Sequence, residues 1–346
     1  MYKYPMPIDK NYFSLLQMSP QIHSMGDSLY SYLKIKIHSN LELDKIKKIN
    51  IIGKFDRSNG ISNNEKDGKL FNFMRPTINL CGDEAELRCF PGIDYVFHFS
   101  NVVSSYSYLM NYKIDISCML PSEEICWKEL CDSSLQNIPK VDTVIMGYVE
   151  GLDFLSCDKE WLGEGNFLYK RINTKSGKAI LLGCKHTYWG EIAGRIIVFL
   201  SMLEVKRVIY SGKLGTLDSQ CVPNESIATG NMSRLPNGEL VIWDNLFENY
   251  TSPLINKGAH ITVPSVLQET KWWVEQTKNE FMFVDPEIGH MAYAAQQNNM
   301  QYSYLHIVSD NLSQKYSYDL SNERKIEVIS KRCELMKTIG EAIRQL

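Results

Sequence analysis

The chain has 346 residues, of which 44% are hydrophobic and 22% are charged, an ordinary composition for a globular protein of about two domains. Its net charge of −3 argues against the basic surface of a nucleic-acid-binding protein. The longest apolar run, Ile196 to Leu203, is far shorter than a membrane span, and the N-terminus lacks a signal-peptide core. We therefore expect a cytoplasmic protein with no nucleic-acid or membrane partner.

The cysteines and histidines point away from disulfides and metals. Nine cysteines are an odd number, and they form no Cys-x-x-Cys pair, which favours reduced thiols. The seven histidines do not combine with them at the spacing of a zinc site. No metal and no cofactor are expected.

Residues 1–138 are predicted to form a separate α+β domain of unknown role. Ile49–Ile52 has the pattern of a short strand, and a polar loop follows from Arg57 to Lys69. Tyr95–Phe99 and Ile114–Cys118 are predicted as further strands. The aromatic residues of this region are interpreted as core, because large aromatics usually serve burial; the alternative is that some line a pocket over an active site.

From residue 139 onward, predicted strands and helices alternate, which favours a mixed α/β sheet with helices on both faces. Val141–Asp153 reads as a strand and its turn, with Gly147 at the strand end. Ala179–Cys184 is a strand that leads through a polar loop into a helix from Glu191. The last segment, Asn322–Leu346, has apolar residues at helical spacing and is predicted to be an amphipathic helix.

The segment Glu204–Leu217 is predicted to be a strand, Val208–Ser211, that runs into a glycine turn at Gly212 and Gly215. Glycine in such a turn lets the backbone approach an anion or a ribose closely. Lys213, between the two glycines, would add a point charge for an anion; a solvated surface lysine is the alternative.

The most informative segment is Val284–Asn311. Asp285 is suited to cap a helix and Pro286 to its first turn, which places Glu287 at the helix start. Tyr302–Val308 follows as a buried strand, closed by Ser309 and Asp310. Ligands of open α/β sheets bind beyond the carboxyl ends of strands, so Asp310 is placed for chemistry.

This pattern resembles the nucleoside phosphorylase superfamily, in particular the methylthioadenosine/adenosylhomocysteine nucleosidases and bacterial purine nucleoside phosphorylases, whose signature pairs a Met-Glu helix start with a Ser-Asp strand end. The resemblance implies that Glu287 binds the ribose 2′- and 3′-hydroxyls and that Asp310 protonates purine N7. Pro286 stands where the family has a methionine against the sugar and base. Ser309 and Gly212 belong to the same implied substrate site.

The polar loop after Ala179–Cys184 resembles the Gly-Arg-x-His-x-Tyr-Glu-Gly segment of trimeric purine nucleoside phosphorylases. The matching residues are Gly183, His186, Tyr188 and Gly190. Cys184 replaces the phosphate-binding arginine, and Lys185 is next to it. The resemblance therefore implies a rebuilt phosphate or anion site, to which we assign Lys213, Lys185, His186 and Gly147.

Hydrolytic members of the superfamily carry a glutamate that orders the attacking water in the turn after the first strand. Here the aligned position is Leu152, and Glu150 lies two residues away. Glu150 is therefore the candidate for positioning water. The resemblance covers about residues 139–346 and implies a nucleoside phosphorylase-like fold, a mixed twisted sheet flanked by helices, with an added N-terminal domain.

The function these residues imply is cleavage of the N-glycosidic bond of a purine nucleoside or nucleotide-like substrate, by phosphorolysis with inorganic phosphate or by hydrolysis. Bond cleavage builds positive charge on the ribose and negative charge on the base, so an anion near the sugar and an acid near N7 both act on the transition state. The alternative is a non-catalytic nucleoside- or nucleotide-binding protein derived from this fold. A homo-oligomer, dimer or trimer, is expected.

Overall fold

The computed structural model describes residues 14–57, 60, 62, 65, 68–315 and 325–346. The chain divides into two compact units, one of residues 1–132, 185–193 and 263–274, and the other of residues 133–184, 194–262 and 275–346. Two segments from the second half of the chain thus complete the first unit. A domain boundary at residues 138 and 139 stays a prediction.

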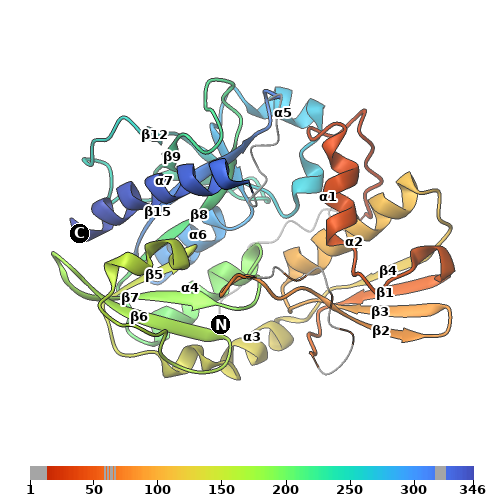
Figure 1. Ribbon diagram of the computed structural model, residues 1–346, viewed down its shortest axis with the longest axis horizontal. Coiled ribbons are helices and arrows are strands. Elements are labelled where there is room, and N and C mark those ends of the chain that lie inside the picture. Colours follow the sequence, from red (N-terminus) through yellow and green to blue (C-terminus); the bar gives the residue numbers. More distant parts are fainter. Residues whose placement is uncertain (1–13, 58–59, 61, 63–64, 66–67, 316–324) are drawn as a thin grey trace. The chain divides into compact units, whose positions relative to one another are not determined.

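The first unit contains a four-stranded sheet in the order β2-β3-β1-β4 (Figure 1). Its strands are β1 Lys48–Ile52, β2 Thr77–Cys81, β3 Glu84–Arg88 and β4 Asp115–Met119. The central strand β1 is parallel to both β3 and β4, and β2 pairs with β3 antiparallel. The strands predicted at Ile49–Ile52 and Ile114–Cys118 are confirmed.

The helices of this unit include α2, Ile93–Leu109, so the strand predicted at Tyr95–Phe99 is wrong. Nearly the whole of α2 is buried, including polar residues. A helix buried on all sides shows no amphipathic period, and a short aromatic run within it cannot be told from a strand. The other helical segments of the unit are α1 Ser28–Lys36, α3 Glu123–Cys131 and the short 3₁₀ turns η2 Leu43–Lys45 and η5 Val266–Gln268.

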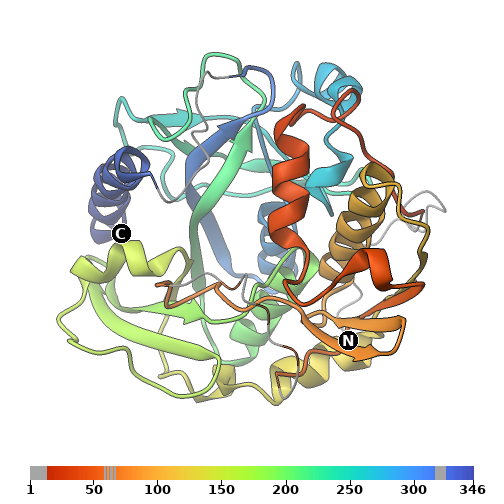
Figure 2. The same ribbon diagram turned by 45° about the vertical axis from the view of Figure 1, so that its right-hand side comes forward.

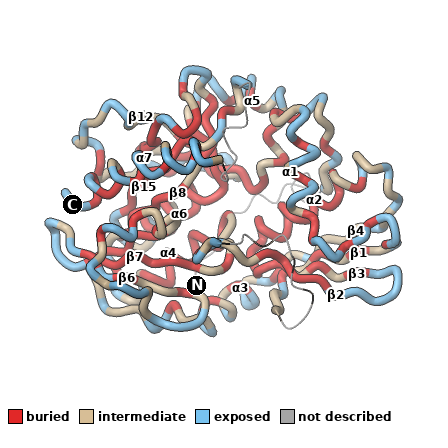
Figure 3. The backbone as a smooth tube through the Cα atoms, in the orientation of Figure 1, coloured by how far each residue is buried: buried red, intermediate tan, exposed pale blue. Residues whose placement is uncertain are grey.

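The second unit is built on an eleven-stranded mixed sheet within the described residues. The strands are β5 Thr143–Gly147, β6 Phe167–Thr174, β7 Gly177–Cys184, β8 Arg207–Thr216, β9 Ile227–Thr229, β10 Met232–Arg234, β11 Leu240–Ile242, β12 Ile255–Lys257, β13 His260–Thr262, β14 Phe283–Asp285 and β15 Gln301–Asn311. The long strands β8 and β15 run side by side and parallel (Figure 2), and most of their residues are buried (Figure 3).

Helices cover this sheet. Helix α6, Ile288–Gln297, packs on β10, β13 and β15, and α7, Ile326–Arg344, packs on β6, β15 and the 3₁₀ turn η4, Val149–Leu155. The remaining helical segments are η3 Ser134–Asn137, α4 Glu191–Met202 and α5 Lys271–Thr277, of which α4 and α5 begin in the first unit and end in the second. The predicted fold class, a mixed α/β sheet flanked by helices, is confirmed.

The glycine turn predicted at Gly212 and Gly215 is wrong, because β8 continues through both glycines to Thr216. Its ladder with β15 runs from Arg207 to Thr216, so the backbone hydrogen bonds that a turn would interrupt are made along the whole strand. No helix in the described part of the chain has the length and apolar character needed to cross a bilayer.

Candidate functional site

One edge of β8 is shared by two strands that approach from opposite directions. Strand β5 is parallel to β8 and ends where Gly147 pairs with Ser211. Strand β14 is antiparallel to β8 and pairs Phe283 and Val284 with Thr216 and Gly215. The carboxyl ends of β5 and β14 therefore face one another across residues 212–214 of β8. We call this place the edge break; carboxyl ends of strands are where α/β sheets bind ligands.

Gly147 brings the end of β5 against β8 in a way that only glycine permits. Its φ is +105°, and a Cβ built on it would lie 1.9 Å from the carbonyl oxygen of Ser211. The N–H of Tyr148 donates to the same oxygen at 2.6 Å. This contact starts η4, which carries Glu150, and it places the ring of Tyr148 with its centroid 6.0 Å from Nζ of Lys213.

Glu287 reaches the edge break from β14. It is the residue before α6, is 8% exposed, and accepts a long hydrogen bond of 3.5 Å at Oε2 from the hydroxyl of Tyr210. Asp285 caps the helix as predicted, because its Oδ1 accepts the N–H groups of Glu287 and Ile288 at 2.9 and 2.8 Å. A helix N-terminus favours a carboxylate, and both Glu287 and Pro286 are buried.

Asp310 stands on the other side of β8, just after a bulge in β15. Val308 pairs with Leu214 and Asp310 with Gly215, so Ser309 is left out of the ladder. The hydroxyl of Ser309 lies 2.7 Å from Oδ1 of Asp310 and 3.2 Å from the carbonyl oxygen of Leu214. Because side chains alternate along a strand, the skipped residue moves Asp310 to the face of the sheet that carries Gly215.

The pKa of the Asp310 carboxyl is raised. Although the residue is exposed at the surface, neighbouring protein atoms exclude water from its carboxyl. This loss of hydration is the largest cause of the raised pKa. The Ser309 hydrogen bond and the positive charges of Arg332, Lys213 and Lys315 oppose this rise without cancelling it. An acid that must donate a proton near neutral pH needs a shift in this direction.

The two carboxylates are presented from different faces of β8. Tyr210, which contacts Glu287, and Lys213 are three residues apart in one strand, so their side chains point to opposite faces. Strands β14 and β15 also lie on opposite edges of β8, so the two carboxylates approach this strand from opposite sides. A ligand that touches both has to reach from the edge break to the β15 side of β8.

Gly212 is explained by packing within the protein. A Cβ on it would lie 2.6 Å from Nε2 of His306, so the absence of a side chain makes room for this imidazole. Sequence reasoning missed His306, Tyr210 and His260, because none of them belongs to a motif. Only the fold shows what they contact.

Lys185 and His186 belong to the first unit, whereas Gly147 and Lys213 lie in the second. His186 is buried, stacked on Phe90 with ring centroids 4.4 Å apart, and meets the ring of Phe55 edge-on at 4.8 Å. Burial, with the charges of Arg57 and Lys185 as lesser causes, lowers the pKa of His186 to about 3. A neutral imidazole between aromatic rings has no charge to offer an anion.

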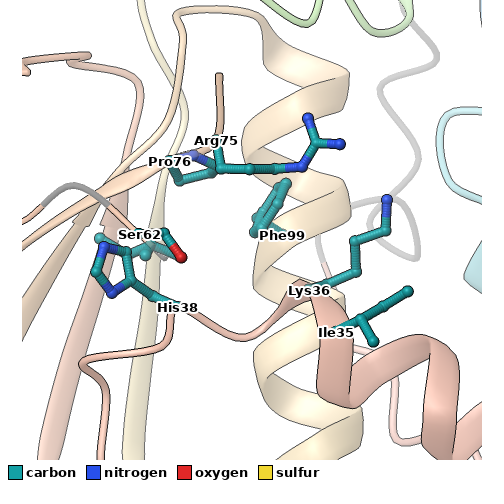
Figure 4. A pocket seen from close by; sticks show the side chains of 8 residues that line it. Ile35, Lys36, His38, Ser62, Arg75, Pro76 and Phe99 are labelled. Carbon is teal, nitrogen blue, oxygen red and sulfur yellow. The ribbon is translucent and has the colours of Figure 1, made fainter. Parts of the chain in front are cut away.

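Two hollows are lined by other residues. One, in the first unit, is lined by Ile35, Lys36, His38, Ser62, Arg75, Pro76, Leu87 and Phe99. In Figure 4 the guanidinium of Arg75 points away from His38 and Ser62, so its polar groups do not converge. The other has about 530 Å³ and is lined by Ser134, Asn137, Ile138, Gly163, Glu164, Phe167 and Tyr169. Neither is lined by Glu287 or Asp310.

No protein-family model matches the chain. Among curated proteins, it is similar to Oxidoreductase cns1 of Cordyceps militaris, with 25% identity over 256 residues, or 65% of this chain. The chain spans about a third of that protein's length, because the match covers 32% of it.

Several solved structures are similar to this one. A methylthioadenosine nucleosidase described as putative, from Weissella paramesenteroides, has a TM-score of 0.46 at 12% identity, over 60% of this chain and 99% of that one. The 5′-methylthioadenosine/S-adenosylhomocysteine nucleosidase of Neisseria meningitidis, in complex with methylthio-immucillin-A, has a TM-score of 0.46 at 14% identity, over 60% and 100%. Purine nucleoside phosphorylase of Toxoplasma gondii, in complex with immucillin-H, has a TM-score of 0.45 at 13% identity, over 60% and 92%.

Proposed function

We propose that this protein cleaves the N-glycosidic bond of a purine nucleoside or a nucleotide-like small molecule. The observation that carries the proposal is the placement of two carboxyl groups on the two sides of β8: Glu287, at a helix start beside the edge break, and Asp310, an acid with a raised pKa after a strand bulge in β15. These are the two groups that the reaction requires, and they come from separate strands that flank β8.

In the proposed reaction, Glu287 accepts hydrogen bonds from the ribose hydroxyls. Its negative charge also favours the positive charge that develops on the sugar as the C1′–N9 bond breaks. Asp310 gives its proton to N7, so the electron pair of the breaking bond leaves with a neutral base. Water or phosphate then adds to C1′, and Asp310 recovers a proton from solvent.

Two residues at the edge break bear on the identity of the nucleophile. Lys213 is half-buried beside Tyr148 and near Asp310, which supports an anion, either inorganic phosphate or a phosphate group of the substrate. Glu150, in the 3₁₀ turn after Gly147, supports an ordered water. Phosphorolysis leaves a ribose 1-phosphate and stalls without phosphate, whereas hydrolysis proceeds without it.

The test is a panel of nucleosides and nucleotides, each incubated with and without phosphate and read by released base. Asp310→Asn should lower the rate by about a hundredfold or more while ligand affinity stays within about tenfold. Asp244→Asn, a change at an exposed aspartate, is the matched control and should behave like the wild type. Base release by Asp310→Asn at the wild-type rate would remove Asp310 from the chemistry. Binding of nucleosides without base release by the wild type would favour the non-catalytic alternative.

A further inference from the structure

The first turn of α6 is held by side chains. The N–H groups of Glu287 and Ile288 both donate to Oδ1 of Asp285, at 2.9 and 2.8 Å, and the N–H of Gly289 donates to Oγ1 of Thr262 at 2.9 Å. The first backbone donors of a helix have no partner within the helix itself. Here three consecutive donors, beginning with that of Glu287, are bound to two buried side chains.

The two accepting side chains are connected to each other behind the helix. Oγ of Ser233 lies 3.1 Å from Oγ1 of Thr262 and 2.9 Å from Nδ1 of His260. Nε2 of His260 lies 3.1 Å from Oδ1 of Asp285. The result is a closed polar ring, which we call the Ser233–Asp285 ring, made of Ser233 on β10, His260 and Thr262 on β13, Asp285 on β14 and the start of α6.

A second histidine ties the ring to the other contact of Glu287. Nε2 of His306 lies 3.8 Å from Oδ2 of Asp285, and its ring meets that of Tyr210 edge-on with centroids 4.5 Å apart. Tyr210 is the residue whose hydroxyl donates to the Glu287 carboxylate. Glu287 is thus held through its backbone by Asp285 and through its side chain by Tyr210, and His306 packs against both of these residues.

Ser233, His260 and Asp285 have the residue types of a nucleophile, a base and an orienting acid. An acyl-transfer role does not fit, because the three are 0%, 0% and 3% exposed, and the Ser233 hydroxyl is already shared with Thr262. Gly289 fits the positioning role instead. A Cβ there would lie 2.4 Å from Oγ1 of Thr262 and 2.7 Å from Oγ of Ser233, so glycine lets the helix start approach the ring.

We propose that the Ser233–Asp285 ring is a positioning device that fixes Glu287 for recognition of the ribose 2′,3′-diol. This inference rests on the proposed function, since it takes Glu287 as the ribose-binding carboxylate. Members of the ring do not touch the substrate; they set the place of the carboxylate. Loosening the ring should therefore weaken discrimination between ribose and 2′-deoxyribose and should leave the acid step at Asp310 unchanged.

Thr262→Val is the main test, because it removes the acceptor of the Gly289 N–H with little change in shape, and Thr262→Ser keeps the hydroxyl as the matched rescue. Loss of one buried hydrogen bond corresponds to a change of about two- to tenfold. We expect Thr262→Val to raise KM for a ribonucleoside by about that factor, with the KM for its 2′-deoxy analogue nearly unchanged. Thr262→Ser should match the wild type.

Ser233→Ala tests whether the whole ring, and not only a local cap of α6, positions Glu287. It removes the link between Thr262 and His260 but leaves the acceptors of the helix N–H groups in place. It should shift KM in the same direction as Thr262→Val. Amide hydrogen exchange gives a readout independent of activity: the N–H groups of residues 287–289 should exchange faster in both variants, while those of α7 keep their wild-type rates.

The outcomes separate the two proposals. Absence of base release by the wild type would overturn the proposed function, and the sugar comparison is then made on binding affinities. Unchanged exchange at residues 287–289 in Thr262→Val, or equal losses for ribo- and deoxyribonucleosides, would overturn the positioning role. Wild-type behaviour of Ser233→Ala would mean that Asp285 and Thr262 act only as a local cap of α6. It would therefore overturn the positioning role of the ring as well.

Discussion

Substituting Gly212 by alanine should destabilise the protein through a single contact. The added Cβ would lie 2.6 Å from Nε2 of His306, where ordinary contact begins at 3.4 Å, so the imidazole has to retreat by about 0.8 Å. It has little freedom to do so, because it is 0% exposed and its ring meets those of Tyr210 and Tyr304, with centroids 4.5 and 5.4 Å away. Overpacking of this kind costs about 1–3 kcal/mol.

The assay is a double-mutant cycle on the free energy of unfolding, measured in urea for the wild type, Gly212→Ala, His306→Ala and the double variant. Once the imidazole is removed, alanine at position 212 should be neutral or stabilising by up to about 1 kcal/mol, because it reduces the entropy of the unfolded chain. The effect of Gly212→Ala should therefore change sign between the two backgrounds. Equal destabilisation in both would refute the packing explanation. If Gly212→Ala is stable but binds substrate more weakly, the result would support the sequence-based prediction that Gly212 lies in the substrate site.

Three further outcomes are expected. Glu287→Gln should weaken binding of ribonucleosides more than that of 2′-deoxy analogues, because an amide oxygen accepts hydrogen bonds less strongly than a carboxylate; calorimetry on both sugars checks this, and equal losses count against it. Lys213→Ala should lower activity far more than Lys337→Ala, a change on α7, in assays with and without phosphate; full activity of Lys213→Ala in both removes the anion site. Burial lowers the pKa of His290 to about 3 from 6.5, so its contribution to stability is complete above pH 6.5 and is lost as the pH falls toward 3. At pH 5 the loss is about 2 kcal/mol, and urea unfolding at pH 7.5 and 5 should show a smaller pH dependence for His290→Gln, whereas an unchanged dependence would contradict it.

The sequence was most informative where a local chemical rule decides the structure. Asp285 was expected to cap a helix, and it does so through two N–H groups, although α6 begins at Ile288 and Asp285 itself ends β14. The strand at Tyr302–Val308 was expected from its β-branched and aromatic residues, and it lies within β15. The roles of Glu287 and Asp310 stay predictions, because nothing in the fold alone shows a bound sugar or base.

What the sequence did not reveal depends on partners far along the chain. The two glycines of β8 suggested a turn, but each makes room for a side chain. Gly212 accommodates His306 of β15, and Gly215 accommodates Leu312, the residue after β15. His186 was expected at an anion site by its place in a motif, yet its surroundings come from Phe55 and Phe90. Neither contact follows from a local pattern, because each joins segments separated by about a hundred residues.

The bulge at Ser309 has a consequence for how related chains should be compared. A relative with the same residues but no bulge would pair its acid with the residue equivalent to Thr216 and would turn it toward the opposite face of the sheet, since side chains alternate along a strand. It would also misplace the residue equivalent to Asn311, whose amide here binds the carbonyl oxygens of Asp218 and Cys221. A sequence alignment without gaps hides both changes. The bulge itself, more than the Ser-Asp pair, therefore distinguishes chains with this acid geometry from chains that share only the sequence.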